Sequence, residues 1–210
     1  MATGVEESAP PAVEEDEDRA VLERVADGDA EAFALLVERH QERLVRVCTR
    51  MLGDREEARD AAQEAFLKAF RGAADYRPRG KVYTWLYRIA VNHCLNKLRR
   101  RRIVRFLSLS GPAEGTGGDE APAFDPATDA PGPDDALESR QRWQRARRAI
   151  AGLPPNQRAV LVLARFEGLA YKEIAEVLGI TLGAVESRLV RAMRNLSAAM
   201  EDDAAKENGA

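Results

Sequence analysis

The sequence has only two cysteines, and no hydrophobic run approaches the roughly 20 residues that a membrane-spanning helix needs. Aromatic residues make up only 6% of the chain, and no segment rich in Val, Ile or Thr alternates apolar and polar residues. The first two features argue against a disulfide scaffold and against direct membrane insertion. The missing alternation argues against β-sheet, so the sequence predicts an all-α protein.

The scarcity of metal-ligating residues argues against a metal centre. Cys48, Cys94, His40 and His93 are the only Cys and His residues, and none of them forms a Cys-x-x-Cys or His-x-x-x-His pair. Zinc sites normally need such close ligand spacing. We therefore expect no metal and no cofactor, and two free thiols in a chain without a signal peptide favour a cytoplasmic location.

The net charge of −3, taken alone, argues against a nucleic-acid partner, because phosphate binding depends on Lys and Arg. This total, however, combines segments of very different charge. Residues 1–18 carry a charge of −7, residues 108–135 carry −7 and residues 201–210 carry −3, so the remaining residues carry +14. The acidic segments lack a periodic apolar face. We expect disordered acidic tails over 1–18 and 201–210, and a flexible acidic linker over 108–135.

The first basic segment, residues 19–107, predicts a small helical bundle. Asp29 is placed to cap a helix with apolar residues every three or four positions, and Gly53-Asp54 to end that helix and cap the next. The second helix has a narrow face of small residues, and a polar loop over about 72–81 leads to a third helix from about Val82 to Arg102. The residues expected to pack in the bundle are Phe33, Leu36, Val37, His40, Leu44, Val47 and Met51 on the first helix and Ala58, Ala61, Ala62, Ala65, Phe66 and Ala69 on the second.

The second basic segment, residues 136–200, predicts a smaller helical domain. Helices are expected over about 136–152, from a cap at Asn156 to about Phe166, over 171–178, and from Thr181 to about Met200. The last two, with a turn at Gly179-Ile180, have the spacing of a DNA-binding helix-turn-helix. Thr181 is the expected cap, and Arg188 the expected contact to a base or phosphate. An ordinary helical hairpin with solvated charges is the plainer alternative.

Aromatic and cationic residues alternate where the third helix of the first module begins. Such a mixture suits stacking on unpaired bases together with contacts to phosphate. We expect Trp85, Leu86 and Ile89 to face the core, which leaves Tyr76, Tyr83 and Tyr87 as candidates to stack on bases.

Two sets of motifs, in this order, resemble the extracytoplasmic-function sigma factors. Residues 60–67 (DAAQEAFL) and 83–92 (YTWLYRIAVN) are similar to region 2 of that family. Residues 153–158 (LPPNQR), 171–175 (YKEIA) and 183–192 (GAVESRLVRA) are similar to its region 4. The resemblance implies two small helical domains joined by the linker, and a non-enzymatic subunit that directs RNA polymerase to promoters.

The resemblance also assigns roles to residues. The second helix of region 2 would dock on the largest subunit of core RNA polymerase, through Asp60, Gln63, Glu64, Phe66 and Leu67. The melted non-template strand of the minus-10 element would contact Tyr76, Arg77, Lys81, Tyr83, Arg88, Asn92, Asn96, Arg99 and Arg100. The duplex minus-35 element would contact Lys172, Thr181, Ala184, Glu186, Ser187, Arg188 and Arg191. Glu186 departs from the family pattern, in which many members have a basic residue.

By the same resemblance the acidic linker would thread the active-site cleft and RNA exit path of core RNA polymerase, whose beta and beta-prime subunits are the expected partners. An anti-sigma factor would restrain the protein. Two other functions stay open at this point. A stand-alone helix-turn-helix regulator would explain the second module but not the first. A metal-dependent or hydrolytic enzyme would need a catalytic set of residues, and the sequence offers none in a pocket-like context.

Overall fold

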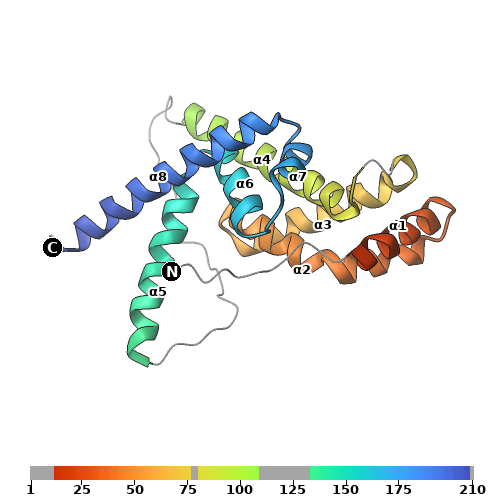
Figure 1. Cartoon of the computed structure of the whole chain (residues 1–210), viewed down its shortest axis with the longest axis horizontal. Helices are drawn as coiled ribbons and strands as arrows, with labels where there is room; N and C mark the ends of the chain where they lie inside the picture. The colour runs from red at the N-terminus through yellow and green to blue at the C-terminus, as the bar shows by residue number, and fades with distance from the viewer. Residues whose placement is uncertain (1–11, 77–79, 109–132, 209–210) are drawn as a thin grey trace.

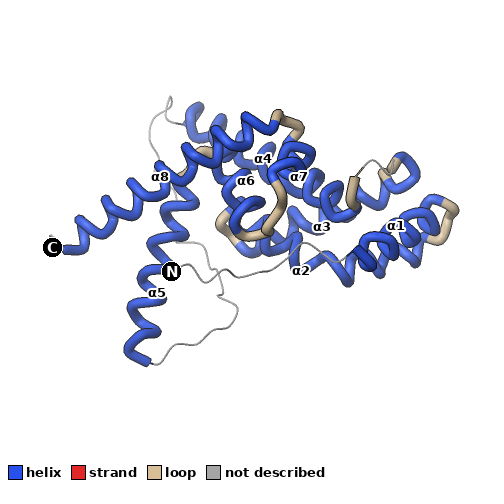
Figure 2. Tube along the Cα trace, viewed as in Figure 1, coloured by secondary structure: helices blue, strands red, loops and turns tan. Residues whose placement is uncertain are grey.

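The computed structural model describes residues 12–76, 80–108 and 133–208, and within these ranges every regular element is helical (Figure 1). Short loops and turns join the helices within each module (Figure 2). Arg77 and the linker residues 109–132 lie outside the described ranges. The predicted all-α class is confirmed.

The first module consists of α1 (Ala12–Ala26), η1 (Ala30–Ala32), α2 (Phe33–Leu52), α3 (Arg55–Arg71), η2 (Ala73–Asp75) and α4 (Val82–Ser108). Helices α2, α3 and α4 pack against one another, and the alanine face of α3 permits their close approach. Both predicted apolar faces are buried, apart from a half-buried Val37.

The predicted caps are present, but Asp29 caps the short helix η1, which leads directly into α2 at Phe33, whereas Asp54 caps α3 itself. The Asp29 carboxylate accepts a hydrogen bond from the Ala32 amide at 3.2 Å, and the Asp54 carboxylate accepts one from the Glu57 amide at 2.7 Å. Gly53 ends α2 with a φ of 80°, a left-handed conformation that costs glycine little because glycine has no Cβ.

The second module consists of α5 (Pro133–Gly152), α6 (Pro155–Arg165), α7 (Tyr171–Leu178) and α8 (Leu182–Asn208). Gly179 has the expected positive φ, at 62°, and the Thr181 hydroxyl accepts a hydrogen bond from the Ala184 amide. Asn156 does not cap α6. Pro154 occupies the cap position and Pro155 the first helical position, where a missing N–H costs nothing.

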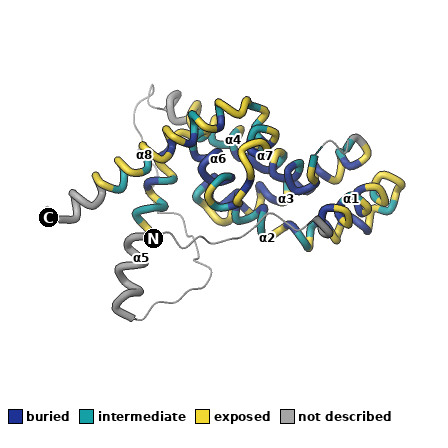
Figure 3. The backbone as a smooth tube through the Cα atoms, viewed as in Figure 1, coloured by how far each residue is buried: buried dark blue, intermediate teal, exposed yellow. Residues whose placement is uncertain are grey.

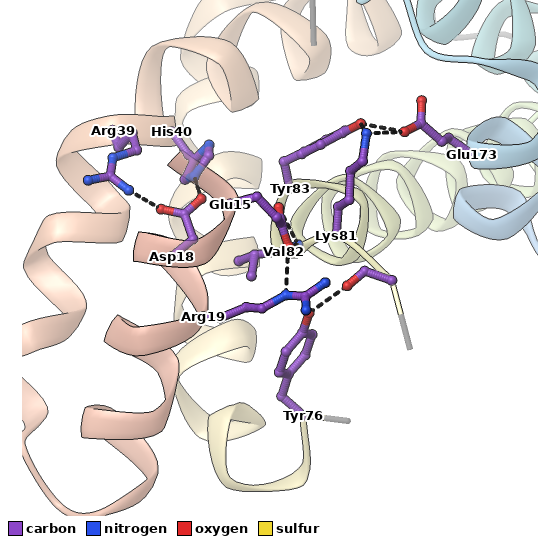
Figure 4. Close-up of polar contacts among 11 residues, drawn as sticks. Glu15, Asp18, Arg19, Arg39, His40, Tyr76, Lys81, Val82, Tyr83 and Glu173 are labelled. Atoms are coloured by element: carbon purple, nitrogen blue, oxygen red, sulfur yellow. Dashed lines mark hydrogen bonds and ion pairs between the residues drawn. The ribbon is translucent and has the colours of Figure 1, made fainter. Parts of the chain in front are cut away.

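The prediction of a disordered tail over residues 1–18 is wrong from Ala12 onward, because α1 begins there. Two of its acidic side chains are buried and satisfied (Figure 4). Glu15 accepts hydrogen bonds from the Val82 amide at 2.7 and 3.0 Å, and Asp18 lies 2.6 Å from His40 and also pairs with Arg39. Composition alone suggested solvation, but specific partners on α2 and α4 hold these carboxylates.

The C-terminal boundary at residue 200 is also wrong, because α8 continues to Asn208. Figure 1 shows the end of α8 and the start of α5 projecting away from the packed helices. The buried segments gather instead where α2, α3, α4 and α6 meet (Figure 3).

The two modules share one apolar core, which contains buried residues of α2, α4, α6, α7 and α8. Arg158 of α6 strengthens this junction. Its guanidinium is buried and donates to the Met51 carbonyl of α2 at 2.6 Å, and also to the Ala151 and Leu153 carbonyls. Burial lowers the pKa of Arg158, and backbone carbonyls provide acceptors for its charge.

Candidate nucleic-acid and protein interfaces

The outer face of α3 is open to solvent, as the predicted polymerase contacts require. Asp60, Gln63 and Leu67 are exposed and Glu64 is half-buried, but Phe66 is only 7% exposed. The Phe66 ring packs edge-on against Phe33, with 6.3 Å between the centroids. Phe66 is therefore a core residue in this conformation and not a contact, because its position in the alanine stripe turns it inward.

The sequence reasoning missed a better apolar partner for Leu67. Phe70 is 40% exposed, and it lies three positions further along the same helix. Leu67 and Phe70 thus form an apolar pair beside the exposed Asp60 and Gln63. The i, i+3 spacing was the signal that could have identified Phe70.

The loop before α4 is held at both ends. The Tyr76 hydroxyl donates to the Gly80 carbonyl at 2.9 Å, and the Tyr76 ring lies 5.0 Å from that of Trp85. Arg19 of α1 lies close to Tyr76 in Figure 4. Tyr76 and Trp85 are both half-buried, so Trp85 is less buried than predicted.

The predicted exposure of Tyr83 and Tyr87 is wrong for this conformation. They are 2% and 3% exposed, and each hydroxyl donates to a carboxylate of the second module. Lys81 and Arg88 beside them are exposed. Sequence reasoning missed this burial because the covering residues are about 80 to 90 positions away along the chain.

The second half of α4 presents the remaining predicted minus-10 residues to solvent. Asn92, Asn96, Arg99 and Arg100 are exposed, and the Asn96 side chain accepts a hydrogen bond from Arg99 at 3.2 Å. These residues form one polar, basic strip. Such a strip suits the phosphate backbone, whose contacts position a protein without reading sequence.

The helix-turn-helix presents the predicted minus-35 residues around the start of α8. Lys172, Thr181, Glu186 and Arg191 are exposed, while Ala184, Ser187 and Arg188 are half-buried. The N-terminus of α8 is exposed from Thr181 to Gly183, as entry into a major groove requires. Val190, which was not among the predicted residues, is 69% exposed on the same helix.

Helix α7 lies against the start of α4 and brings Glu173 to two of the predicted minus-10 residues (Figure 4). The Glu173 carboxylate accepts hydrogen bonds from Tyr83 at 2.6 Å and from Lys81 at 2.9 Å. Desolvation acts to raise the pKa of Glu173, but hydrogen bonds from Tyr83, Lys81 and the Ala170 amide outweigh it and lower that pKa. The same pairing raises the pKa of Lys81.

A second carboxylate, Glu167, lies deeper in the same junction. It accepts hydrogen bonds from Tyr87 at 2.8 Å and from Arg50 of α2 at 2.7 Å, and its side chain is 4% exposed. Desolvation raises the pKa of Glu167, against the opposing effects of Tyr87 and the nearby arginines. Nothing in the local sequence pattern marks Glu167, which follows α6 in a short loop.

Within the described ranges, no group of three or more His, Cys, Asp or Glu side chains is placed to hold a metal ion. Cys48 and Cys94 are both buried free thiols. In that same part of the chain, no helix is both long and apolar enough to cross a membrane.

Comparison with known proteins accounts for both modules. Residues 36–103 match the family model for sigma-70 region 2, and residues 143–196 match the one for sigma-70 region 4. The RNA polymerase sigma-H factor of Pseudomonas aeruginosa is 36% identical over 189 residues, which cover 89% of this chain and 95% of that protein. The ECF RNA polymerase sigma-E factor of Haemophilus influenzae is 35% identical over 181 residues, covering 83% and 90%. The chain belongs to the extracytoplasmic-function sigma factors.

Solved structures of other proteins share the fold. CnrH, in complex with the cytosolic domain of CnrY, has a TM-score of 0.62 and 26% identity, covering 90% of this chain and 99% of CnrH. The sigma factor RpoE from Bartonella quintana, in complex with the anti-sigma factor NepR, has a TM-score of 0.61 at 20% identity, over 80% of this chain and 96% of RpoE. This sigma factor thus has both modules of the family, which a stand-alone helix-turn-helix regulator would lack.

Proposed function

We propose that this sigma factor binds core RNA polymerase, recognises minus-35 and minus-10 promoter elements, and helps to melt the promoter. The observation that carries the proposal is the pair of modules, each with an exposed face suited to one of these tasks. The chain binds the polymerase and positions it on the promoter, and the polymerase catalyses RNA synthesis. The proposed location is the cytoplasm.

Polymerase docks on the outer face of α3 in this proposal. Leu67 and Phe70 supply apolar area, and Asp60, Gln63 and Glu64 supply a polar and acidic rim. An apolar centre with a charged rim is typical of protein interfaces and suits a basic helical partner.

In this proposal, the non-template strand of the minus-10 element lies along α4. Lys81, Arg88, Arg99 and Arg100 pair with phosphate, Asn92 and Asn96 contact the backbone or bases, and Tyr76 and Tyr83 stack on unpaired bases. Arg77 belongs to the same proposed set and lies outside the described residues. Unstacking a base costs a few kcal/mol, which stacking on aromatic rings offsets.

The minus-35 duplex meets the start of α8, with Lys172 of α7 beside it. Arg188 and Arg191 are the main cationic contacts, and Thr181, Ala184, Glu186 and Ser187 lie nearest the base edges. Arg188→Ala should weaken binding to the minus-35 duplex by about 1–3 kcal/mol. Arg194→Ala, the same change on an exposed arginine further along α8, is the matched control and should leave sequence preference unchanged.

An anti-sigma factor restrains this protein in the proposal. The support is that the Bartonella quintana RpoE, which shares the fold, was solved in complex with the anti-sigma factor NepR, and CnrH in complex with the cytosolic domain of CnrY. A pull-down with the protein encoded beside this one tests it, with run-off transcription in the presence of that protein as the functional readout.

Run-off transcription tests the main proposal. Core polymerase with this protein should give discrete transcripts from genomic fragments, and core polymerase alone should not. If the protein instead shifts DNA as a free dimer and adds no transcripts, the proposal is wrong.

A further inference from the structure

The two cysteines of the chain meet in the core of the first module. Cys48 lies on α2 and Cys94 on α4, both are free thiols, and each has 0% of its surface exposed. The two thiols are hydrogen-bonded to each other. Because α2 and α4 pack against each other, this contact joins two helices of the bundle. The only cysteines in the sequence are thus neighbours in space, although they are far apart in the chain.

Neither thiol has a part in the functions proposed above. The proposed polymerase and DNA contacts include no cysteine, and among the described residues no third metal-ligating side chain joins the pair. A single buried cysteine behaves as a small apolar core residue. Two thiols in direct contact have a further chemistry, because together they can lose two electrons and two protons and become a disulfide.

The packing around Cys94 suits a bond between the helices. A disulfide requires Cα atoms about 4.4–6.8 Å apart, so the two helices must approach closely where it forms. Ala90 is fully buried one turn before Cys94, so α4 presents two small side chains on this stretch of its core face. Oxidation would shorten the separation of the two sulfurs to about 2.05 Å, which draws α4 toward α2.

Cys94 lies behind the polar, basic strip on the second half of α4. Asn92 and Asn96, two positions before and after it, are exposed. Side chains two positions apart point to nearly opposite sides of a helix, so the thiol faces the core while the two amides face solvent. A movement of Cys94 toward α2 therefore moves the same turns of α4 that carry the strip.

We propose that Cys48 and Cys94 are a redox-sensitive pair, which a peroxide oxidises to a disulfide that ties α4 to α2. The sulfur of one cysteine attacks a peroxide oxygen, the O–O bond breaks, and water leaves behind a sulfenic acid. The second thiol attacks that sulfur, the S–O bond breaks, and a second water leaves. Two thiols and one hydrogen peroxide thus become one disulfide and two waters. The effect of the disulfide on transcription, but not its formation, rests on the proposed minus-10 contacts.

The surroundings of the pair make its oxidation slow. The hydrogen bond with Cys94 and burial raise the pKa of Cys48 well above its usual range, so Cys48 is a thiol and a weak nucleophile at neutral pH. Hydrogen peroxide is small and uncharged, and it reaches such a site when the core opens briefly. The disulfide therefore forms under sustained oxidant and is reversed by thiols, as in the transient, redox-sensing disulfides of reducing compartments.

The test treats the full chain with graded hydrogen peroxide and compares it with Cys48→Ala and Cys94→Ala, which each keep one thiol. The unmodified protein should lose both thiols and about 2 Da of mass, and should yield a peptide cross-linked through both cysteines. Its melting temperature should rise by roughly 5–10 °C and return with dithiothreitol. Neither variant should show the rise relative to its own untreated form. Methionine oxidation is common to all three proteins and is not reversed by dithiothreitol.

Run-off transcription with core polymerase measures the consequence, after the peroxide has been removed. The oxidised protein should give roughly three-fold less transcript than the reduced protein, as expected if contacts worth about one hydrogen bond are weakened along α4. Dithiothreitol should restore the yield. Peroxide treatment should leave the yield of both variants unchanged.

Loss of thiols without the cross-linked peptide overturns the redox pair, as does no loss of thiols at a peroxide dose that oxidises the unfolded chain. A cross-link that leaves transcription unchanged overturns the connection to the strip on α4. The proposed function fails separately: if the reduced, unmodified protein gives no specific transcripts, the assignment of the DNA sites is wrong, and the cross-linking result decides the redox pair by itself.

Discussion

The outer face of α3 and the start of α4 belong to the same module, yet they differ in what covers them. Along α3, Leu67 is 49% exposed and Phe70 is 40% exposed, and among the described helices of the second module none packs closely on that face. At the start of α4, Tyr83 and Tyr87 are buried under acidic side chains of the second module.

The proposed polymerase face on α3 is therefore open to solvent in this conformation, whereas the aromatic part of the proposed minus-10 face is not.

The largest expected effect is on stability, and it distinguishes Phe66, a core residue, from its neighbour Leu67 on the proposed polymerase face. Phe66→Ala should lower the free energy of unfolding by about 3–5 kcal/mol, because it removes a buried ring that packs on Phe33. Chemical denaturation measures it. A loss below about 1 kcal/mol would mean that Phe66 is not a core residue, and would restore it to the polymerase face.

Leu67→Ala should leave stability nearly unchanged but weaken binding to core polymerase about ten-fold, as expected for an exposed apolar interface residue. The measurement is a fluorescence titration of labelled protein with core polymerase in the absence of DNA. Leu182→Ala, the same change at a leucine that is 42% exposed on α8, is the control. If the two variants bind core polymerase with equal affinity, the outer face of α3 is not part of the polymerase interface.

A smaller effect concerns the support of α4 from α1. Glu15→Ala leaves the Val82 amide without its acceptor and should cost about 1 kcal/mol of stability, whereas Glu15→Gln retains an acceptor oxygen and should cost less. Thermal melting compares the two. If the two variants melt at the same temperature, the hydrogen bond from the Val82 amide does not stabilise the start of α4.

The sequence predicted what depends on local pattern. The faces of α2 and α3, the caps at Asp29, Asp54 and Thr181, and the turn at Gly179 are set by residues a few positions apart, and the structure confirms them. Helix α7 was placed at its observed bounds for the same reason.

The wrong predictions for the buried carboxylates and tyrosines have one physical cause, which is contact between residues far apart in the chain. Glu15 and Asp18 were predicted to lie in a solvated tail because their partners, Val82 and His40, lie 67 and 22 positions away. Tyr83 was predicted to be a free ring for the same reason, since Glu173, which accepts from its hydroxyl, lies 90 positions away. Composition describes such residues on average and cannot anticipate an individual partner.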